Sequence, residues 1–190
     1  MALLRYRQVF QCVVLALGWG WFVAAQHSSA QESEASEYAV KAAFIVSFPK
    51  YVDWPAEEFT DANSPIIIGV LGETKVTRDL QRVIAGRVVN GRELILKRLA
   101  PGEEETAIFN ILFVPAEEQR RALNFLAKHK RGALTIGESD DFLESGGIIC
   151  LRRRNQKISL EVNLASAGSA GIRLSSKLLG VASAVKGRSN

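Results

Sequence analysis

Segments rich in aliphatic residues alternate with amphipathic segments along the middle of the chain. The aliphatic segments predict strands at 66–71, 93–99, 111–114 and 133–136, the second entered through a turn at Asn90-Gly91. Apolar residues at three- and four-residue steps predict helices at 77–85 and 115–130. The inward positions of these two helices are Leu80, Val83 and Ile84, and Ala122, Leu123, Leu126 and Ala127.

The pattern changes toward the end of the chain. Residues 148–151 and 157–164 predict an antiparallel hairpin across 152–156, and the second strand alternates apolar residues with Ser159, Glu161 and Asn163 on a polar face. A last helix is predicted at 174–185, with Leu174, Leu178, Val181, Ala182 and Val185 inward. The fold class is therefore α/β: a single-domain three-layer sandwich with a mixed, mostly parallel sheet, a C-terminal antiparallel hairpin and helices on both faces.

An amphipathic helix opens the domain. Val40, Ala43, Phe44, Phe48 and Tyr51 share one face of a predicted helix that Ser36 caps and Trp54-Pro55 ends. Proline at position 49 removes a helix hydrogen bond, so we expect the helix to kink or to end early.

The first thirty residues have the layout of a secretory signal peptide. Arg5 and Arg7 precede an uncharged, mostly apolar stretch at 9–25, and small residues follow it. We expect cleavage after Ala25 or Ala30, which assigns 1–30 to the signal peptide and 31–190 to the exported domain. A retained transmembrane anchor is the alternative interpretation.

Charge and cysteine content exclude several functions. The formal net charge of +4 falls to about +2 without the leader, too little to indicate nucleic-acid binding. Cys150 is then the only cysteine, and its apolar surroundings predict a buried, inert thiol. His129 is predicted at a solvated helix end, so the chain offers no ordinary zinc site and no nucleophile–base pair. No metal, cofactor or catalytic residue is predicted, and the protein is not expected to be an enzyme.

Several motifs resemble the YfiR-like family of small periplasmic proteins. They are Tyr38-x-Val40-Lys41-Ala42-Ala43-Phe44, Lys50-Tyr51-Val52-Asp53-Trp54-Pro55, Gly146-Gly147-Ile148, Asn163-Leu164 and the run 170–179. The chain departs from those family members that carry paired cysteines, and it has Val46-Ser47-Phe48-Pro49 in the first helix where members often have Tyr-Asn-Phe-Ala. The resemblance implies a periplasmic repressor that binds the periplasmic sensing part of an inner-membrane diguanylate cyclase and lowers cyclic di-GMP. It also makes a homodimer plausible.

Two similar turns are candidates for ligand contact. Gly72-Glu73-Thr74 and Gly137-Glu138-Ser139 each follow a predicted strand and precede a predicted helix, which Thr74 or Ser139 can cap. Both lie at strand carboxyl ends, where open α/β sheets usually bind ligands. Acidic loops suit a cationic or zwitterionic ligand. Ordinary strand-to-helix turns are the simpler interpretation.

Partner contact is predicted at two further places. Tyr51 and Trp54 belong to an aromatic cluster that either packs in the core or forms an interface. Arg152, Arg153 and Arg154 are expected at the hairpin tip, where they either touch anionic headgroups or an acidic partner or are simply solvated. The alternative function is a periplasmic small-molecule-binding module for a sensor or transporter, which predicts a deep pocket between the Gly72 and Gly137 loops.

Overall fold

The computed structural model describes residues 37–100, 102–128 and 131–187. The predicted leader, the Ser36 cap, His27 and His129 lie outside the described residues. The chain divides into residues 1–37 and a compact unit, Tyr38–Asn190, which contains the elements below apart from Glu37, the first residue of the N-terminal helix.

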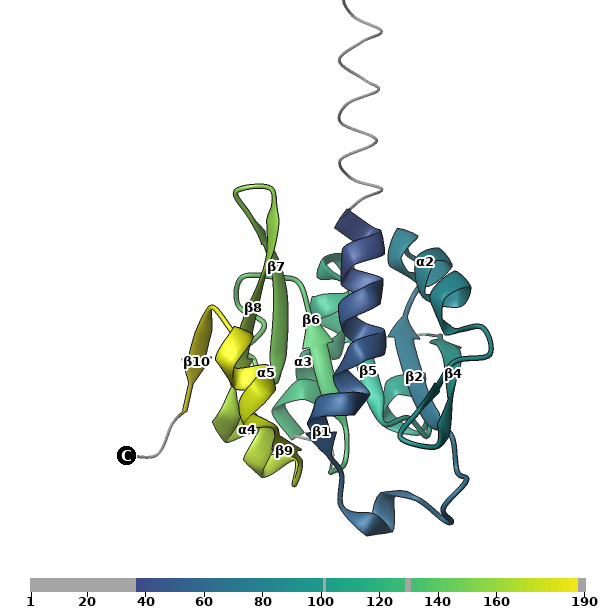
Figure 1. Ribbon diagram of the computed structural model, residues 1–190. Coiled ribbons are helices and arrows are strands. Elements are labelled where there is room, and N and C mark those ends of the chain that lie inside the picture. Colours follow the sequence, from purple (N-terminus) through teal and green to yellow (C-terminus); the bar gives the residue numbers. More distant parts are fainter. Residues whose placement is uncertain (1–36, 101, 129–130, 188–190) are drawn as a thin grey trace, which may run out of the picture. The chain divides into compact units, whose positions relative to one another are not determined.

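An eight-stranded sheet forms the centre of this unit (Figure 1). Its strand order is β10-β8-β7-β6-β5-β2-β4-β3, and only the pairs β7–β8 and β3–β4 are antiparallel. In chain order the strands are β2 (Ile66–Leu71), β3 (Val88–Val89), β4 (Arg92–Leu99), β5 (Ile111–Val114), β6 (Leu134–Gly137), β7 (Ile149–Arg154), β8 (Lys157–Asn163) and β10 (Ala184–Lys186). A separate pair joins β1 (Val52–Asp53) to β9 (Arg173–Leu174).

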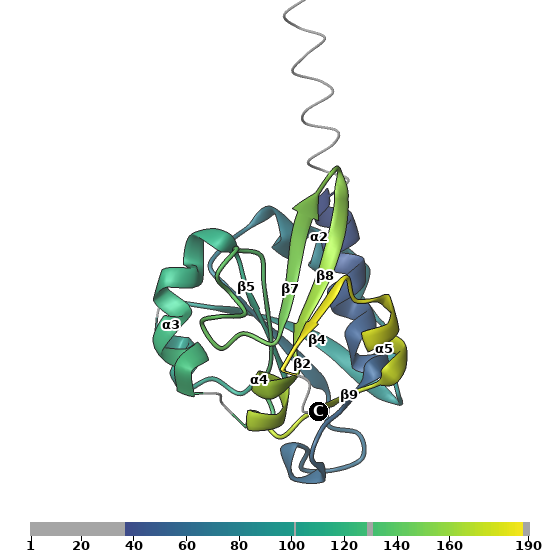
Figure 2. The ribbon, with the colours of Figure 1, turned by 90° about the vertical axis from the view of Figure 1, so that its left-hand side faces the viewer.

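Helices cover both faces of the sheet, which completes the predicted three layers (Figure 2). The N-terminal helix (residues 37–47), α2 (Lys75–Ile84), α4 (Leu164–Ser169) and α5 (Ser176–Val181) contribute to one core cluster. The opposite face is covered by α3 (Gln119–Lys128) and residues 138–147. Short 3₁₀ turns lie at η1 (Phe48–Tyr51), η2 (Ala56–Glu58), η3 (Glu103–Glu105) and η4 (Ala116–Glu118).

Alternating side chains of the central strands fill the two cores. On β5, Ile111 and Phe113 belong to the first cluster, whereas Leu112 and Val114 belong to the second. All four are at most 1% exposed, which explains why this strand is a continuous apolar run. The α/β class, the mixed sheet and the hairpin are confirmed, and β2 and β5 have the predicted bounds.

The structure corrects the predicted ends of the helices. The first helix leaves α-geometry before Pro49, as expected, but the chain then forms η1 and the short strand β1 instead of remaining helical to Trp54. The last helix is only six residues long, and residues 184–186 form an edge strand beside β8. Val181 is 68% exposed rather than buried. On α3, Phe125 is buried and Leu123 is 39% exposed, the reverse of the prediction for Leu123.

Candidate functional site

The Gly72 turn has a structural explanation. Thr74 caps α2, because its Oγ1 accepts a hydrogen bond from Thr77 N at 3.4 Å and Thr77 Oγ1 accepts one from Thr74 N at 3.2 Å. The cap was predicted, and each such interaction stabilises a helix by about 1 kcal/mol. The side chain of Glu73 is 75% exposed and lies 3.7 Å from Arg98. Solvent screens such a pair, so it adds little to stability.

Glu138 of the second turn forms a buried ion pair. Its Oε1 lies 2.6 Å from Lys41 Nζ, and the two side chains are 11% and 6% exposed. Its Oε2 accepts a hydrogen bond from Ala116 N at 3.3 Å. The pair therefore joins the N-terminal helix to the carboxyl ends of β5 and β6, and it gives Lys41 of the first family motif a structural role. Because its carboxylate already has these partners, Glu138 is not a free contact for a ligand.

Residues 139–146 form turns, which corrects the prediction that Ser139 caps a helix. Phe142 of this segment is fully buried. Its ring lies against Gly137 and Gly147, and a Cβ atom on either glycine would collide with it. This contact explains the Gly146-Gly147 motif, since Gly146 also has a φ of 97°.

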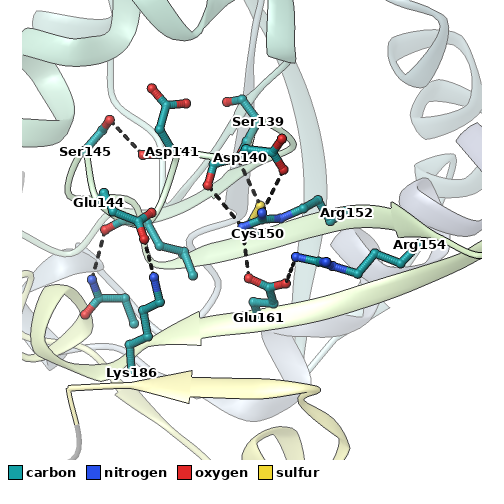
Figure 3. A network of polar contacts seen from close by, with 12 residues as sticks. Ser139, Asp140, Asp141, Glu144, Ser145, Cys150, Arg152, Arg154, Glu161 and Lys186 are labelled. Atoms are coloured by element: carbon teal, nitrogen blue, oxygen red, sulfur yellow. Dashed lines mark hydrogen bonds and ion pairs between the residues drawn. The ribbon is translucent and has the colours of Figure 1, made fainter.

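The three arginines lie within β7, not at the hairpin tip. The tip consists of Asn155 and Gln156, whose φ angles of 47° and 62° suit a two-residue hairpin turn. Arg152 donates to Asp140 Oδ1 at 2.7 Å and to Glu161 Oε2 at 2.9 Å, and its side chain is 14% exposed (Figure 3).

Glu161 of β8 is a buried carboxylate that two arginines of β7 share. Arg154 donates to its second oxygen at 3.3 Å, so two guanidinium groups share one carboxylate. Glu161 is only 7% exposed, so the polar face predicted for β8 is buried at this residue, where the carboxylate is paired with both arginines. Arg153 alternates to the opposite side of β7 and pairs in register with Ile158.

Cys150 lies in the same network, and its predicted burial is confirmed. Its Sγ donates to Ser139 O at 3.4 Å, and the residue is 0% exposed. Burial raises the pKa of the thiol to about 11, an effect that the nearby Arg152 guanidinium only partly offsets. The protonated thiol is therefore a poor nucleophile at neutral pH.

A groove lies beside Trp54, at the amino ends of β2 and β4. Its volume is about 460 Å³, and its lining residues are Val52, Asp53, Trp54, Ala56, Phe59, Asp61, Ala62, Ile66, Asn90 and Arg92. Trp54 and Phe59 meet edge to face, with ring centroids 6.2 Å apart. The Trp54 Nε1–H is buried and has no hydrogen-bond partner among the described residues. Such an unpaired donor costs about 1–3 kcal/mol.

Arg92 holds the outer wall of this groove in place. Its guanidinium lies 3.8 Å from the Phe59 ring centroid. One nitrogen, Nη1, donates to Asp61 O at 3.0 Å and to Ser64 O at 2.7 Å. Sequence reasoning singled out Trp54 but missed Arg92, because Arg92 comes from a hairpin about thirty residues further along the chain.

The structure thus separates the predicted site residues. Trp54 lines the groove, whereas Tyr51 packs against the first core cluster and its carbonyl oxygen accepts from Ser175 N at 2.9 Å. Glu73, Thr74, Glu138 and Ser139 follow the carboxyl ends of strands and do not line the groove. Among the described residues, no cluster of acidic, histidine or cysteine side chains could hold a metal ion. Within the same part of the chain, every helix is too short or too polar to span a bilayer.

The fold defines a single α/β unit with an open, mixed sheet. Residues 38–183 match the family model described as YfiR/HmsC-like (DUF4154), and the chain belongs to this family. No curated protein matches the chain.

Two solved structures are similar in part. One is a conserved domain protein from Vibrio cholerae O1 biovar El Tor str. N16961, with a TM-score of 0.47, 14% identity, and coverage of 63% of this chain and 54% of that chain. The other is an ABC domain in complex with L-Trp from Streptococcus pneumoniae, with a TM-score of 0.45, 11% identity, and coverage of 63% and 55%. The chain thus spans about half the length of each.

Proposed function

We propose that this protein is a periplasmic regulator that binds the periplasmic sensing part of an inner-membrane diguanylate cyclase and represses cyclic di-GMP synthesis. The match of residues 38–183 to the YfiR/HmsC-like family carries the proposal, because regulation of diguanylate cyclases from the periplasm is the function that this family implies. The signal-peptide pattern of residues 1–30 agrees with export.

Repression across a membrane requires differential binding. The protein must bind the inactive conformation of the sensor more tightly than the active one, since a ligand with equal affinity for both shifts neither population. Moving a sensor from about 99% active to about 99% inactive takes a roughly 10⁴-fold difference in affinity. A folded interaction surface of ordinary size can supply that difference without any chemical step.

Several family motifs support a stable binding scaffold. Lys41 pairs with Glu138, Gly147 admits Phe142, and Asn163 Oδ1 accepts from Ser166 N at 3.1 Å to cap α4. These contacts hold elements together and leave the motif residues Asp53 and Trp54 facing the groove. The regulator therefore acts by presenting a surface, and a disulfide signal does not suit a chain whose exported part has Cys150 alone.

Direct binding to a purified partner tests the proposal. The chain from residue 31 is immobilised, and the purified periplasmic domains of the inner-membrane diguanylate cyclases of the same organism are passed over it. We expect saturable binding to at least one of them, and the same cyclase should be recovered from solubilised membranes. Saturable binding to no cyclase domain, with recovery of transporter subunits alone, would contradict the proposal.

A small-molecule-binding module for a sensor or transporter is the second candidate. The groove favours it, because about 460 Å³ lies within the range of small-molecule pockets. The expected cavity between the Gly72 and Gly137 loops has less support, since Thr74 is a helix cap and Glu138 an ion-pair partner. Calorimetry with amino acids and nucleotides should show saturable heat if this function holds, and a flat trace would count against it.

A further inference from the structure

The groove beside Trp54 combines apolar walls with an acidic rim. Val52, Trp54, Phe59 and Ile66 provide aliphatic and aromatic surface. The segment 53–61, which forms much of the lining, contains four acidic residues and no basic residue. Of these, Asp53 and Asp61 line the groove and are exposed.

The lining residues carry a net formal charge of −1, because Asp53 and Asp61 outnumber Arg92. Asp61 Oδ1 accepts a hydrogen bond from Asn63 N at 2.6 Å, and Arg173 of β9 pairs in register with Asp53. Glu57 is paired with Arg131 at 2.8 Å, and its pKa is lowered by a backbone hydrogen bond and by that arginine. Arg92 is the one basic residue of the lining, against two aspartates. Its guanidinium is directed to the Phe59 ring and to two carbonyl oxygens, which fixes the wall in advance of binding.

A groove with these properties selects a particular occupant. Exposed carboxylates steer and orient a cationic partner but contribute little affinity by themselves, because water screens them. The affinity has to come from burial of an apolar side chain against the aromatic walls. A small cation offers no such side chain, and an acidic segment would be repelled by the rim. A docked carbonyl oxygen that reached the Trp54 Nε1–H would also pair a buried donor that has no described partner.

We infer that the Trp54 groove is the docking site for a segment of the partner protein that presents an apolar side chain flanked by lysine or arginine. This inference rests on the proposed function, because it names the surface that the sensor domain contacts. It places the contact at the amino ends of the parallel strands β2 and β4. The Gly72 and Gly137 turns follow the carboxyl ends of strands, at the other end of the sheet (Figure 1).

Two substitutions change the groove without touching the core. Asp53→Lys reverses the charge of an exposed rim residue, and Ala62→Arg places a large cation in the groove from an exposed position. Glu117→Lys is the matched control, since it makes the same kind of charge reversal at an exposed residue after the carboxyl end of β5. Circular dichroism of all three should match that of the parent protein.

The first measurement is the affinity of each variant for the cyclase domain that the parent protein binds. We expect Asp53→Lys and Ala62→Arg to weaken binding by at least about tenfold, and Glu117→Lys to change it by less than about twofold. If both groove variants bind the cyclase domain with an affinity within about twofold of that of the parent protein, the inference is overturned and the proposed function stays intact.

The second measurement does not depend on the cyclase. In a chain that starts at residue 31, Trp54 is the only tryptophan, so its fluorescence reports on the groove. The probe is a ten-residue peptide that alternates lysine with leucine, and the controls are the same peptide with glutamate for lysine and free lysine amide. We expect a saturable change in Trp54 fluorescence with the lysine–leucine peptide alone. This change should be smaller in Ala62→Arg and should weaken as salt is added.

The two arms distinguish the two failures. Saturation by the lysine–leucine peptide, when no cyclase domain binds the parent protein, would overturn the proposed function and keep the groove as a site for basic, apolar segments. Equal response to the glutamate peptide or to lysine amide would overturn the inference about the occupant. The absence of any response, together with unchanged cyclase affinity in the groove variants, would overturn the groove as a docking site.

Discussion

Replacing Lys41 by methionine tests the role of its buried ion pair with Glu138. The substitution keeps the length of the side chain but removes the lysine charge from the Glu138 carboxylate, which is 11% exposed and still accepts a hydrogen bond from Ala116 N. Removing one member of a buried pair costs about 3–5 kcal/mol, because the other charge stays buried without compensation. That loss is a large part of the roughly 5–15 kcal/mol by which a domain of this size is stable.

The assay is urea unfolding of the chain from residue 31, followed by Trp54 fluorescence and circular dichroism. We expect the free energy of unfolding to fall by about 3–5 kcal/mol in Lys41→Met, and the double variant Lys41→Met/Glu138→Leu to recover about 2 kcal/mol or more of it. Lys128→Met is the control, because its pair with Glu105 has the similar distance of 2.9 Å but side chains that are 65% and 39% exposed.

The control should lose less than about 1 kcal/mol. Equal losses in Lys41→Met and Lys128→Met, or additive effects of the two changes in the double variant, would refute the reasoning that burial gives the Lys41–Glu138 pair its importance.

Three other predictions concern local contacts. Gly147→Ala forces its Cβ into the Phe142 ring and should lower the free energy of unfolding by about 1–3 kcal/mol or prevent folding. Gly86→Ser is the control, because this left-handed glycine has open space around it and the change adds backbone strain without a collision. Equal losses in the two variants would contradict the packing argument. Thr74→Ala should cost about 1 kcal/mol in thermal unfolding, and no change would show that the cap is unimportant. Because burial raises the pKa of Cys150 to about 11 from an ordinary 9.0, the unfolded thiol ionises first, so stability should fall between about pH 9 and 11 by up to about 3 kcal/mol. Cys150→Ala should lack this part of the pH dependence, and identical profiles would contradict the assignment.

Apolar runs with sharp ends made parts of the fold predictable. Pro65 and Gly72 bound the run at 66–71, and Pro115 follows the run at 111–114, so β2 and β5 could be located to the residue. The ends of the other helices and strands were harder to place. Val185 has helical spacing from Leu178, but the same residue pairs with Val162 in an edge strand, and the spacing alone could not distinguish the two structures.

The polar contacts could not be predicted because they join residues that are distant in sequence. Lys41 and Glu138 are 97 positions apart, and nothing in either local pattern indicates the other. The arginines of β7 were placed at a hairpin tip because the length of the turn was unknown; a two-residue turn moves Arg152 into the strand and toward Glu161. Similarly, Trp54 was a candidate from its motif, but the groove needs Arg92 from a separate hairpin.

The most direct test of the account is the level of cyclic di-GMP in cells that express this protein together with a diguanylate cyclase whose periplasmic domain binds it in the assay proposed above. The chain with its first thirty residues should lower cyclic di-GMP, and the chain from residue 31, which has no leader, should leave it unchanged at equal abundance. Equal levels with and without the leader, or no decrease with the leader present, would contradict regulation from the periplasm.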